Sequence, residues 1–412
     1  MEVAGIICEY NPFHLGHAGH IGKIRDALGD DCAVVCVMSG NFVQRGDFAV
    51  FNKHARADAA VLCGADLVVE MPAPYALLSA ERFASAGVFI LDRLKICGHI
   101  SFGSESGDLK ALWELAGATV SQEADMLIKE GLNRGLPYAV ARQKAADLIL
   151  GPRAQALRSP NNLLGVEYLK AIAAHKSQLS PMTVQRIGGA HDGDIGFSSS
   201  AIRKKLLKGE KLNLSEPGEE REESDNPFEA VPSAAQAVYL KEIADGRGPV
   251  SMKSYELAML SRLRAIKDFS WLPDATEGLE HRFLRCAASE PTIARILESV
   301  KTKRYAMSRI RRMLMCACLG ITDLDTRIPP PYIRVLAMNR KGMGLLKEAR
   351  DKSELPIITK PAHANRLAGR ALEIFRKEAA ATDFYVLAYQ DESARTGGQE
   401  WRSGPRTVGD SG

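Results

Sequence analysis

The sequence lacks the features of secreted, membrane-spanning and disulfide-rich proteins. Its first residues show no basic segment followed by an apolar one, so we expect no secretory signal. No apolar run approaches the roughly 18–20 residues that span a bilayer. Eight cysteines in 412 residues are too few for a disulfide framework. These absences favour a protein of the reducing cytoplasm, without a membrane partner.

Sites for a protein-bound metal are also missing from the sequence. Cys32/Cys36 and Cys316/Cys318 have no second pair at the spacing that zinc sites use. There is no obvious pair of carboxylates for acid–base catalysis either. We therefore expect no resident metal, and the chain's chemistry must come from other residues.

The length and the composition together indicate two domains. A chain of 412 residues exceeds one typical core, and 46% hydrophobic with 25% charged residues is ordinary for a globular protein. Residues 215–226 hold six acidic residues and one Arg, and no large apolar side chain. We predict a first domain over 1–208, an acidic linker over 209–230, a mainly helical domain over 231–390 and a disordered tail over 391–412.

The first hundred residues alternate short apolar runs with helical patterns. Strands are predicted at 3–8, 32–38, 66–71 and 99–102, with helices between them. Continuous Val and Ile runs are typical of strands that are covered on both faces. The prediction is an α/β fold with a parallel, Rossmann-like sheet, and the second half adds one further strand at 333–338 among helices.

The stretch "GIICEYNPFHLGHAGHI" (residues 5–21) follows the first strand and opens the first helix. A helix start at the carboxyl end of a parallel strand presents free N–H groups to phosphate, and Gly16 allows close approach. His14 and His17 could both face one anion there, while His20 lies one turn deeper. Alone, however, a single H-x-G-H favours a structural role.

A second motif near the end of the same domain raises the specificity of the first. In Ser198-Ser199-Ser200-Ala201-Ile202-Arg203, hydroxyls at a helix start can cap N–H groups or bind phosphate. Arg203 lies one turn into that helix and could reach the same phosphates. The two motifs together predict a phosphate-binding site.

Together these motifs resemble the HIGH-type nucleotidyltransferases. At a closer level, the chain resembles the bacterial tRNA(Met) cytidine acetate ligase family, through "GIICEYNPFHLGHAGHI", "VMSGNFVQRGDFAVFNKHARADAAVLCGADLVVEMP", "SFGSESGDL", "SPNNLLGVEYLKA" and "KTKRYAMSRIRRMLM". The resemblance implies activation of acetate by ATP as acetyl-adenylate. It further implies transfer of the acetyl group to N4 of the wobble cytidine of elongator tRNA(Met), with Mg²⁺ carried by ATP.

The resemblance also implies a set of ATP-binding residues, and its histidines His14 and His17 would be the catalytic pair. Which of Asn161 and Asn162 contacts ATP stays open. The full set comprises Ile7, Cys8, Glu9, Tyr10, Asn11, Pro12, Phe13, His14, Leu15, Gly16, His17, Ala18, Gly19, His20, Gly103, Asn161, Asn162, Arg186, Ser198, Ser199 and Arg203.

Two further residues keep alternative interpretations. Arg45 follows the second strand at its carboxyl end, and could bind acetate, ATP or RNA or be a surface charge. Glu105 could bind ribose hydroxyls or cap a helix, and the cap is the preferred interpretation.

Local charge predicts an RNA surface that the net charge of +4 conceals. Residues 301–350 hold twelve Lys or Arg and three acids, a balance of +9, whereas the first hundred residues have a balance of −3. A basic helix face suits a phosphate backbone, although short charge runs are usually solvated surface. The predicted tRNA-binding residues are Arg304, Arg309, Arg311, Arg312, Arg340 and Lys341.

The leading hypothesis is thus a tRNA(Met) cytidine acetate ligase. One alternative is a nucleotidyltransferase that makes a small dinucleotide cofactor, which leaves the basic region unexplained. Another is an RNA-binding protein with an inactive nucleotide domain, against which the intact histidine motif argues. The sequence leaves the oligomeric state open.

Overall fold

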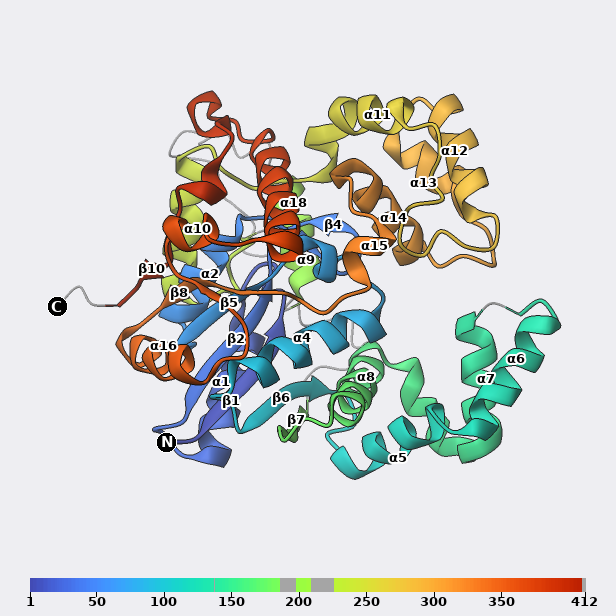
Figure 1. Cartoon of the computed structure of the whole chain (residues 1–412), viewed down its shortest axis with the longest axis horizontal. Helices are drawn as coiled ribbons and strands as arrows, with labels where there is room; N and C mark the ends of the chain where they lie inside the picture. The colour runs from blue at the N-terminus through green and yellow to red at the C-terminus, as the bar shows by residue number, and fades with distance from the viewer. Residues whose placement is uncertain (137, 186–197, 209–225, 410–412) are drawn as a thin grey trace.

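The computed structural model describes residues 1–136, 138–185, 198–208 and 226–409. At its centre, one sheet has the strand order β10-β8-β5-β2-β1-β6-β7 (Figure 1). Strands β1 (Val3–Cys8), β2 (Ala33–Ser39), β5 (Leu67–Met71), β6 (His99–Ser104) and β7 (Ser180–Gln185) pair in parallel. The predicted Rossmann-like α/β sheet is confirmed.

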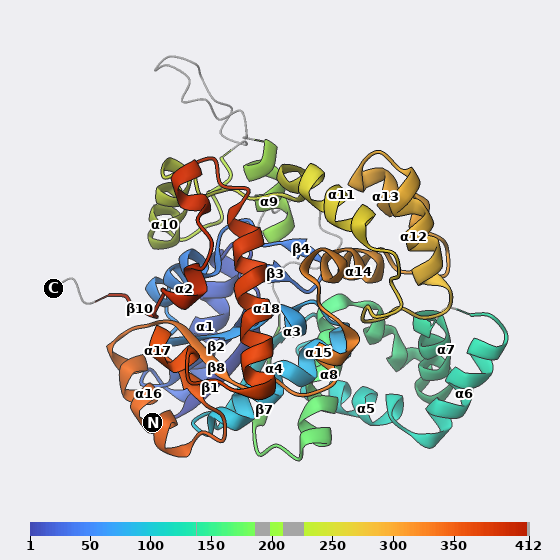
Figure 2. The ribbon, with the colours of Figure 1, turned by 45° about the horizontal axis from the view of Figure 1, so that its top comes forward.

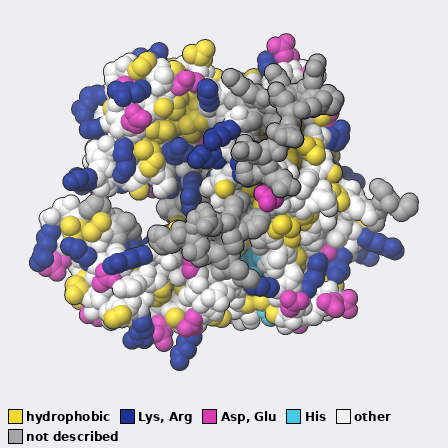
Figure 3. All heavy atoms as spheres, turned by 180° about the vertical axis from the view of Figure 1, so that it is seen from behind, with side chains coloured by type: hydrophobic (Ala, Val, Ile, Leu, Met, Phe, Trp, Pro, Cys, Tyr) yellow, Lys and Arg dark blue, Asp and Glu magenta, His cyan; other side chains and the backbone are white. Residues whose placement is uncertain are grey.

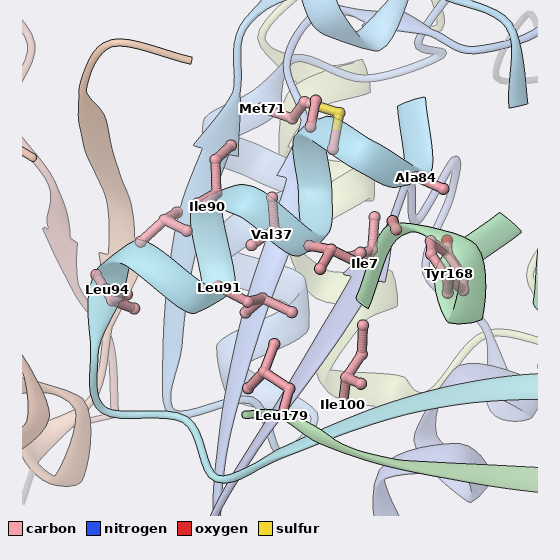
Figure 4. Close-up of a cluster of buried hydrophobic side chains, with 14 of the residues drawn as sticks. Ile7, Val37, Met71, Ala84, Ile90, Leu91, Leu94, Ile100, Tyr168 and Leu179 are labelled. Carbon is pink, nitrogen blue, oxygen red and sulfur yellow. The ribbon is translucent and has the colours of Figure 1, made fainter. Parts of the chain in front are cut away.

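Two cores cover the sheet because neighbouring strand residues point to opposite faces. Ile7, Val37 and Met71 pack under helix α4 (Ala80–Leu94), as Figure 4 shows. Ile6 and Cys36 instead face helices α1 (Leu15–Leu28) and α2 (Lys53–Leu62). Burial on both faces explains the continuous Val and Ile runs of the sequence.

Helices follow the parallel strands and surround both faces. The α4 face also carries α3 (Ala73–Ala76), α5 (Leu109–Thr119) and α8 (Pro160–His175). A side lobe contains α6 (Gln122–Asn133), α7 (Tyr138–Leu150) and the 3₁₀ segment Gly151–Arg158 (Figure 1). The α1 face carries α9 (Ser199–Lys208) and α10 (Ser233–Ala244).

A second lobe consists of helices with a core of their own. It contains the 3₁₀ turn Met252–Tyr255, α11 (Glu256–Ala265), α12 (Leu279–Ser289), α13 (Ile293–Val300) and α14 (Met307–Leu319). Figure 2 shows this lobe beside the short hairpin of β3 (Phe42–Val43) and β4 (Asp47–Phe48), whose Phe42 and Phe48 join its core. The N-terminal half therefore supplies part of the packing of the helical lobe.

The end of the chain returns to the sheet, which corrects the predicted domain division. Strand β8 (Ile333–Met338) has the predicted bounds but pairs antiparallel with β5, so residues 231–390 are not a separate helical unit. It is followed by α16 (Arg340–Lys352), β9 (Ile357–Ile358), α17 (Pro361–Ala364) and α18 (Gly369–Val386), and α15 (Asp323–Thr326) precedes it. Pairing across more than 260 residues is invisible to local sequence patterns.

The expectation of a disordered tail over 391–412 is also wrong for the residues that the structure describes. Residues 392–395 and 399–401 form 3₁₀ turns, and β10 (Arg406–Thr407) pairs with β8. Glu400 is buried, and its carboxylate lies 2.8 Å from Lys53 Nζ and also pairs with Arg334. Composition suggested disorder because these contacts join the segment to residues far away in the sequence. Most of the predicted acidic linker, residues 209–225, lies outside the described residues.

Candidate active site

The histidine motif forms the junction between β1 and α1. His14 is the N-cap of α1, and its Nδ1 accepts from Gly16 N at 3.1 Å. His17 Nδ1 in turn accepts from His14 N at 3.2 Å, which completes a reciprocal cap. Because each Nδ1 is an acceptor, each neutral ring carries its proton on Nε2.

The two rings of this pair are held together but are not equivalent. Their centroids lie 3.7 Å apart with an interplanar angle of 29°. His17 lines the neighbouring cavity, whereas His14 is buried behind it and does not. A Cβ on Gly16 would lie 2.9 Å from His14 Cε1, so only glycine leaves the His14 ring in place. His17 is therefore the histidine of the pair that can contact a ligand in the cavity, and His14 packs against it.

A cavity of about 520 Å³ lies at the carboxyl end of β1. From the predicted ATP-binding set, it is lined by Ile7, Cys8, Glu9, Tyr10, Asn11, His17, His20, Gly103, Asn161, Ser199 and Arg203. These residues come from β1, α1, β6, α8 and α9, so distant segments meet where parallel strands end. The two phosphate motifs of the sequence therefore share one cavity.

The other members of the predicted set do not line this cavity. They are Pro12, Phe13, His14, Leu15, Gly16, Ala18, Gly19, Asn162 and Ser198, and Arg186 lies outside the described residues. Phe13 is buried in the core and its N–H donates to Tyr239 Oη at 2.9 Å. Leu15 and Gly19 are exposed on the outer side of α1. The predicted stretch 7–20 covers both faces of the start of α1, and only the residues of one face line the cavity.

The neighbouring asparagines have different surroundings. Asn161 lines the cavity, whereas Asn162 is buried and its Oδ1 accepts from Glu105 N at 2.9 Å and Ser106 N at 3.1 Å. Glu105 Oε2 accepts from Asn162 N at 2.8 Å, so this carboxylate caps α8, as preferred from the sequence. Asn161 Nδ2 donates to the other oxygen of Glu105 at 2.7 Å, and of the two asparagines Asn161 is the one that lines the cavity.

Arg203 crosses the cavity from α9 to the loop after β1. Its Nη1 donates to the Asn11 carbonyl at 2.6 Å and its Nη2 to Ser200 Oγ at 3.2 Å. Burial lowers the pKa of Arg203, while the charges of Glu9 and Asp47 raise it. The arginine is thus a fixed cation beside the histidine motif.

Glu9 is the carboxylate that faces these cations. Its Oε1 accepts from Gln44 N at 2.6 Å. Burial raises the pKa of Glu9, and the Gln44 N–H and the charges of Arg203 and Arg45 oppose that shift. Arg56 is buried and donates to the carbonyls of Glu9 and Ser39, which ties the carboxyl ends of β1 and β2 together. No pattern in the sequence predicted that Arg56 links these two strand ends.

The β3–β4 hairpin closes the cavity on the side of the helical lobe. Gln44 and Arg45 at its tip line the cavity, as do Ser308 and Arg312 of α14. Gly46 has φ +73°, and a Cβ there would lie 2.4 Å from the Arg312 backbone nitrogen. Because this close approach needs glycine, the hairpin tip is seated directly on α14. Ser308 was not predicted as a site residue, and Arg312 was predicted to bind RNA.

The predicted RNA-binding arginines of α14 and the segment before it are mostly occupied within the protein. Arg309 donates to the Asp274 carbonyl at 2.8 Å, and Arg311 pairs with Asp47 at 3.1 Å. Arg312 pairs with Asp274 at 3.3 Å and is buried. Arg304 remains 55% exposed, although its Nε lies 3.6 Å from Glu277. Partners from distant segments therefore neutralise much of the charge that the sequence shows.

Arg340 and Lys341 lie at the opposite edge of the sheet from the cavity. They open α16, and Lys341 Nζ donates to the Asp31 carbonyl, just before β2 begins, at 3.4 Å. This is the amino edge of the parallel strands, whereas the cavity is at their carboxyl edge. They and the α14 arginines therefore do not form one continuous surface around the cavity.

Within the described ranges, no group of three or more His, Cys, Asp or Glu side chains is arranged to hold a metal ion. Among the described helices, none is both long and apolar enough to cross a bilayer.

The chain is similar to known proteins along nearly its whole length. A family model described as HIGH Nucleotidyl Transferase matches residues 1–400. The tRNA(Met) cytidine acetate ligase of Acetivibrio thermocellus is 36% identical, and the match covers 97% of this chain and 98% of that protein. The ligase of Caldanaerobacter subterraneus is also 36% identical, over 95% of this chain and 96% of that protein. Two crystal structures of Thermotoga maritima TmcAL also match.

Those structures resemble this chain in sequence and in fold. The apo form has a TM-score of 0.90 at 30% identity, and the form bound with alpha-thio ATP has 0.88 at 29%, each covering 99% of this chain and 100% of theirs. The family model, the full-length relatives and the solved structures agree with the fold. The chain belongs to the tRNA(Met) cytidine acetate ligase family of HIGH nucleotidyltransferases.

Proposed function

We propose that this protein is an ATP-dependent ligase that acetylates N4 of the wobble cytidine of elongator tRNA(Met). The observation that carries the proposal is the meeting of His17, Arg203 and Asn161 in one cavity, in a chain of this family. Acetate would be activated there as acetyl-adenylate, and the acetyl group would then pass to the tRNA.

In the first step, an acetate oxygen attacks the α-phosphorus of ATP and the bond to the β-phosphate oxygen breaks. Acetate is already ionised at neutral pH, so this step needs no general base. Negative charge moves onto the leaving pyrophosphate. His17 Nε2–H would donate to the phosphate oxygens, and the buried ring of His14 would hold His17 in position through their stacked contact. Arg203 would neutralise part of the triphosphate charge.

In the second step, the N4 amine of cytidine attacks the acetyl carbon. The bond from that carbon to the AMP oxygen breaks, AMP leaves with the bonding electron pair, and the amine loses a proton. The cavity at the carboxyl edge lies beside the helical lobe, and Figure 3 shows Lys and Arg side chains gathered towards the middle of the face seen from behind. We propose that the tRNA approaches along the helical lobe, with exposed Arg304 among its contacts.

Magnesium would enter with ATP and would be held mainly by the phosphates. The described residues that line the cavity include one carboxylate, Glu9, and that carboxylate is occupied by Gln44 N. This donor set suits a metal that arrives on its nucleotide better than one with protein ligands of its own.

All eight cysteines are free thiols, which fits the cytoplasm, where the tRNA substrate is found.

Pyrophosphate exchange into ATP tests the first step without tRNA. We expect exchange that depends on acetate and is not supported by phosphorylated small molecules at equal concentration. Exchange driven by a mononucleotide instead of acetate would favour a dinucleotide-forming enzyme. RNA binding without exchange would favour an inactive nucleotide domain.

A further inference from the structure

Arg312 combines burial with an opening onto the cavity. It lies on α14, in the region that sequence charge assigned to RNA, but it is 7% exposed and lines the 520 Å³ cavity. Ser308, one helical turn earlier on the same face, lines the cavity as well. An exposed RNA backbone needs exposed cations, so a role in the cavity suits Arg312 better.

Its position is fixed by packing on both sides. Ile310 and Met313 of α14 are fully buried in the core of the helical lobe. The turn at Gly46 is pressed against the backbone of Arg311 and Arg312. The guanidinium therefore has a defined place next to the hairpin tip, where Arg45 also faces the cavity.

The hydrogen-bonding capacity of Arg312 is largely unused. A guanidinium has five N–H donors, and across the described part of the chain Arg312 makes one hydrogen bond, from Nη2 to Asp274 Oδ2 at 3.3 Å. Its Nε is buried and has no partner among the described residues. Leaving charged donors unsatisfied in a buried place is costly, and beside a cavity an anionic ligand can supply the missing acceptors.

The charges of the cavity agree with a strongly anionic occupant. The lining residues include three arginines, Arg45, Arg203 and Arg312, against the single carboxylate of Glu9. Arg203 already uses donors on Asn11 and Ser200. Arg312 is thus the buried cation with the most donors left for a ligand among these three lining arginines, since Arg45 is on the hairpin tip and more exposed.

We propose that Arg312 is a substrate-binding residue of the adenylation step and holds an anionic oxygen of the reacting pair. That oxygen belongs either to the acyl carboxylate or to a phosphate of ATP, which present the same chemistry to a guanidinium. The proposal rests on the proposed function. It makes α14, in the second half of the chain, part of the adenylating site, so that the helical lobe does more than hold tRNA.

The test compares R312Q and R312K with wild type in pyrophosphate exchange without tRNA, with acetate and ATP varied separately. We expect R312Q to raise the KM for one of the two substrates roughly 10- to 100-fold, and the substrate affected identifies the source of the oxygen. R312K keeps the positive charge but loses the paired N–H donors of the guanidinium, so its KM for the affected substrate should fall between those of R312Q and wild type. R295Q is the matched control, because Arg295 is an exposed residue of α13 outside the cavity, and both its KM values should stay within twofold of wild type.

Thermal melting shows which variants are folded, and R312K carries the test if R312Q is not. Unchanged KM values for ATP and acetate in a folded variant would overturn the proposal. So would an increase confined to the KM for tRNA, measured in a separate assay of acetyl transfer to tRNA. Lack of acetate-dependent exchange in wild type would instead refute the proposed function. Calorimetric binding of ATP and of acetate to wild type and R312K would then decide the role of Arg312 without turnover.

Discussion

Replacement of His17 by asparagine should separate catalysis from folding at the histidine motif. The Nδ1 of His17 caps the helix by accepting from His14 N at 3.2 Å, and its Nε2–H is the donor that we assign to phosphate. The Oδ1 of asparagine occupies roughly the place of Nδ1, so H17N keeps the cap acceptor and removes the Nε2 donor. One substitution thus acts on one of the two roles.

The expected magnitudes differ enough to be measured separately. Losing a donor to charge that develops in the transition state lowers kcat by about 10²–10³-fold, equivalent to about 3–4 kcal/mol. A retained cap limits the loss in unfolding free energy to about 1 kcal/mol or less. H17Q, whose amide N–H₂ can approach the place of Nε2, should lose less activity than H17N.

Pyrophosphate exchange with acetate and thermal melting of the same preparations provide the two measurements. We expect near-normal melting of H17N together with a large loss of exchange. An H17N protein that exchanges at the wild-type rate would refute the phosphate-donor role of His17. Equal activities of H17N and H17Q would argue against Nε2 as the donor.

Two further predictions concern the buried charges that join the end of the chain to the sheet, and both are measured by denaturant unfolding. Lys53 Nζ lies 2.5, 2.9 and 2.8 Å from the carboxylates of Glu70, Glu378 and Glu400. Because K53M removes the cation that these buried carboxylates share, it should lower the free energy of unfolding by about 3–5 kcal/mol. A decrease below about 1 kcal/mol would contradict this prediction. Burial and the neighbouring Glu378 raise the pKa of Glu70 from 4.5 to about 7, so its stabilising contribution is complete below pH 4.5 and is lost as the pH rises through 7. Relative to E70Q, wild type should lose about 3 kcal/mol of unfolding free energy between pH 4.5 and 8, and a pH-independent difference between the two proteins would contradict the assignment.

Local patterns predicted the elements of the fold better than their partners. The strand at 333–338 was predicted with the bounds of β8, because a short apolar run between a proline segment and a polar segment is a local signal. Its pairing with β5 and the burial of Glu400 beside Lys53 are long-range events. No window of neighbouring residues contains the information that brings these segments together.

The candidate site shows the same division. His17 and Arg203 were predicted as site residues, since each stands in a motif at the start of a helix, and the structure brings them to one cavity. Ser308 was missed, and Arg312 was assigned to RNA from a one-dimensional count of charge. That count could not include Asp274, which pairs with Arg312, or the turn at Gly46 that covers α14.

Transfer of labelled acetate to tRNA tests the central proposal most directly. Purified protein, ATP, Mg²⁺ and [¹⁴C]acetate are incubated with elongator tRNA(Met) or with the same tRNA carrying uridine at the wobble position, and label in the RNA is counted. The proposed function predicts ATP-dependent label in the cytidine tRNA, recovered as N4-acetylcytidine after nuclease digestion, and none in the uridine tRNA. Equal labelling of both tRNAs, or no label in either despite acetate-dependent exchange, would contradict it.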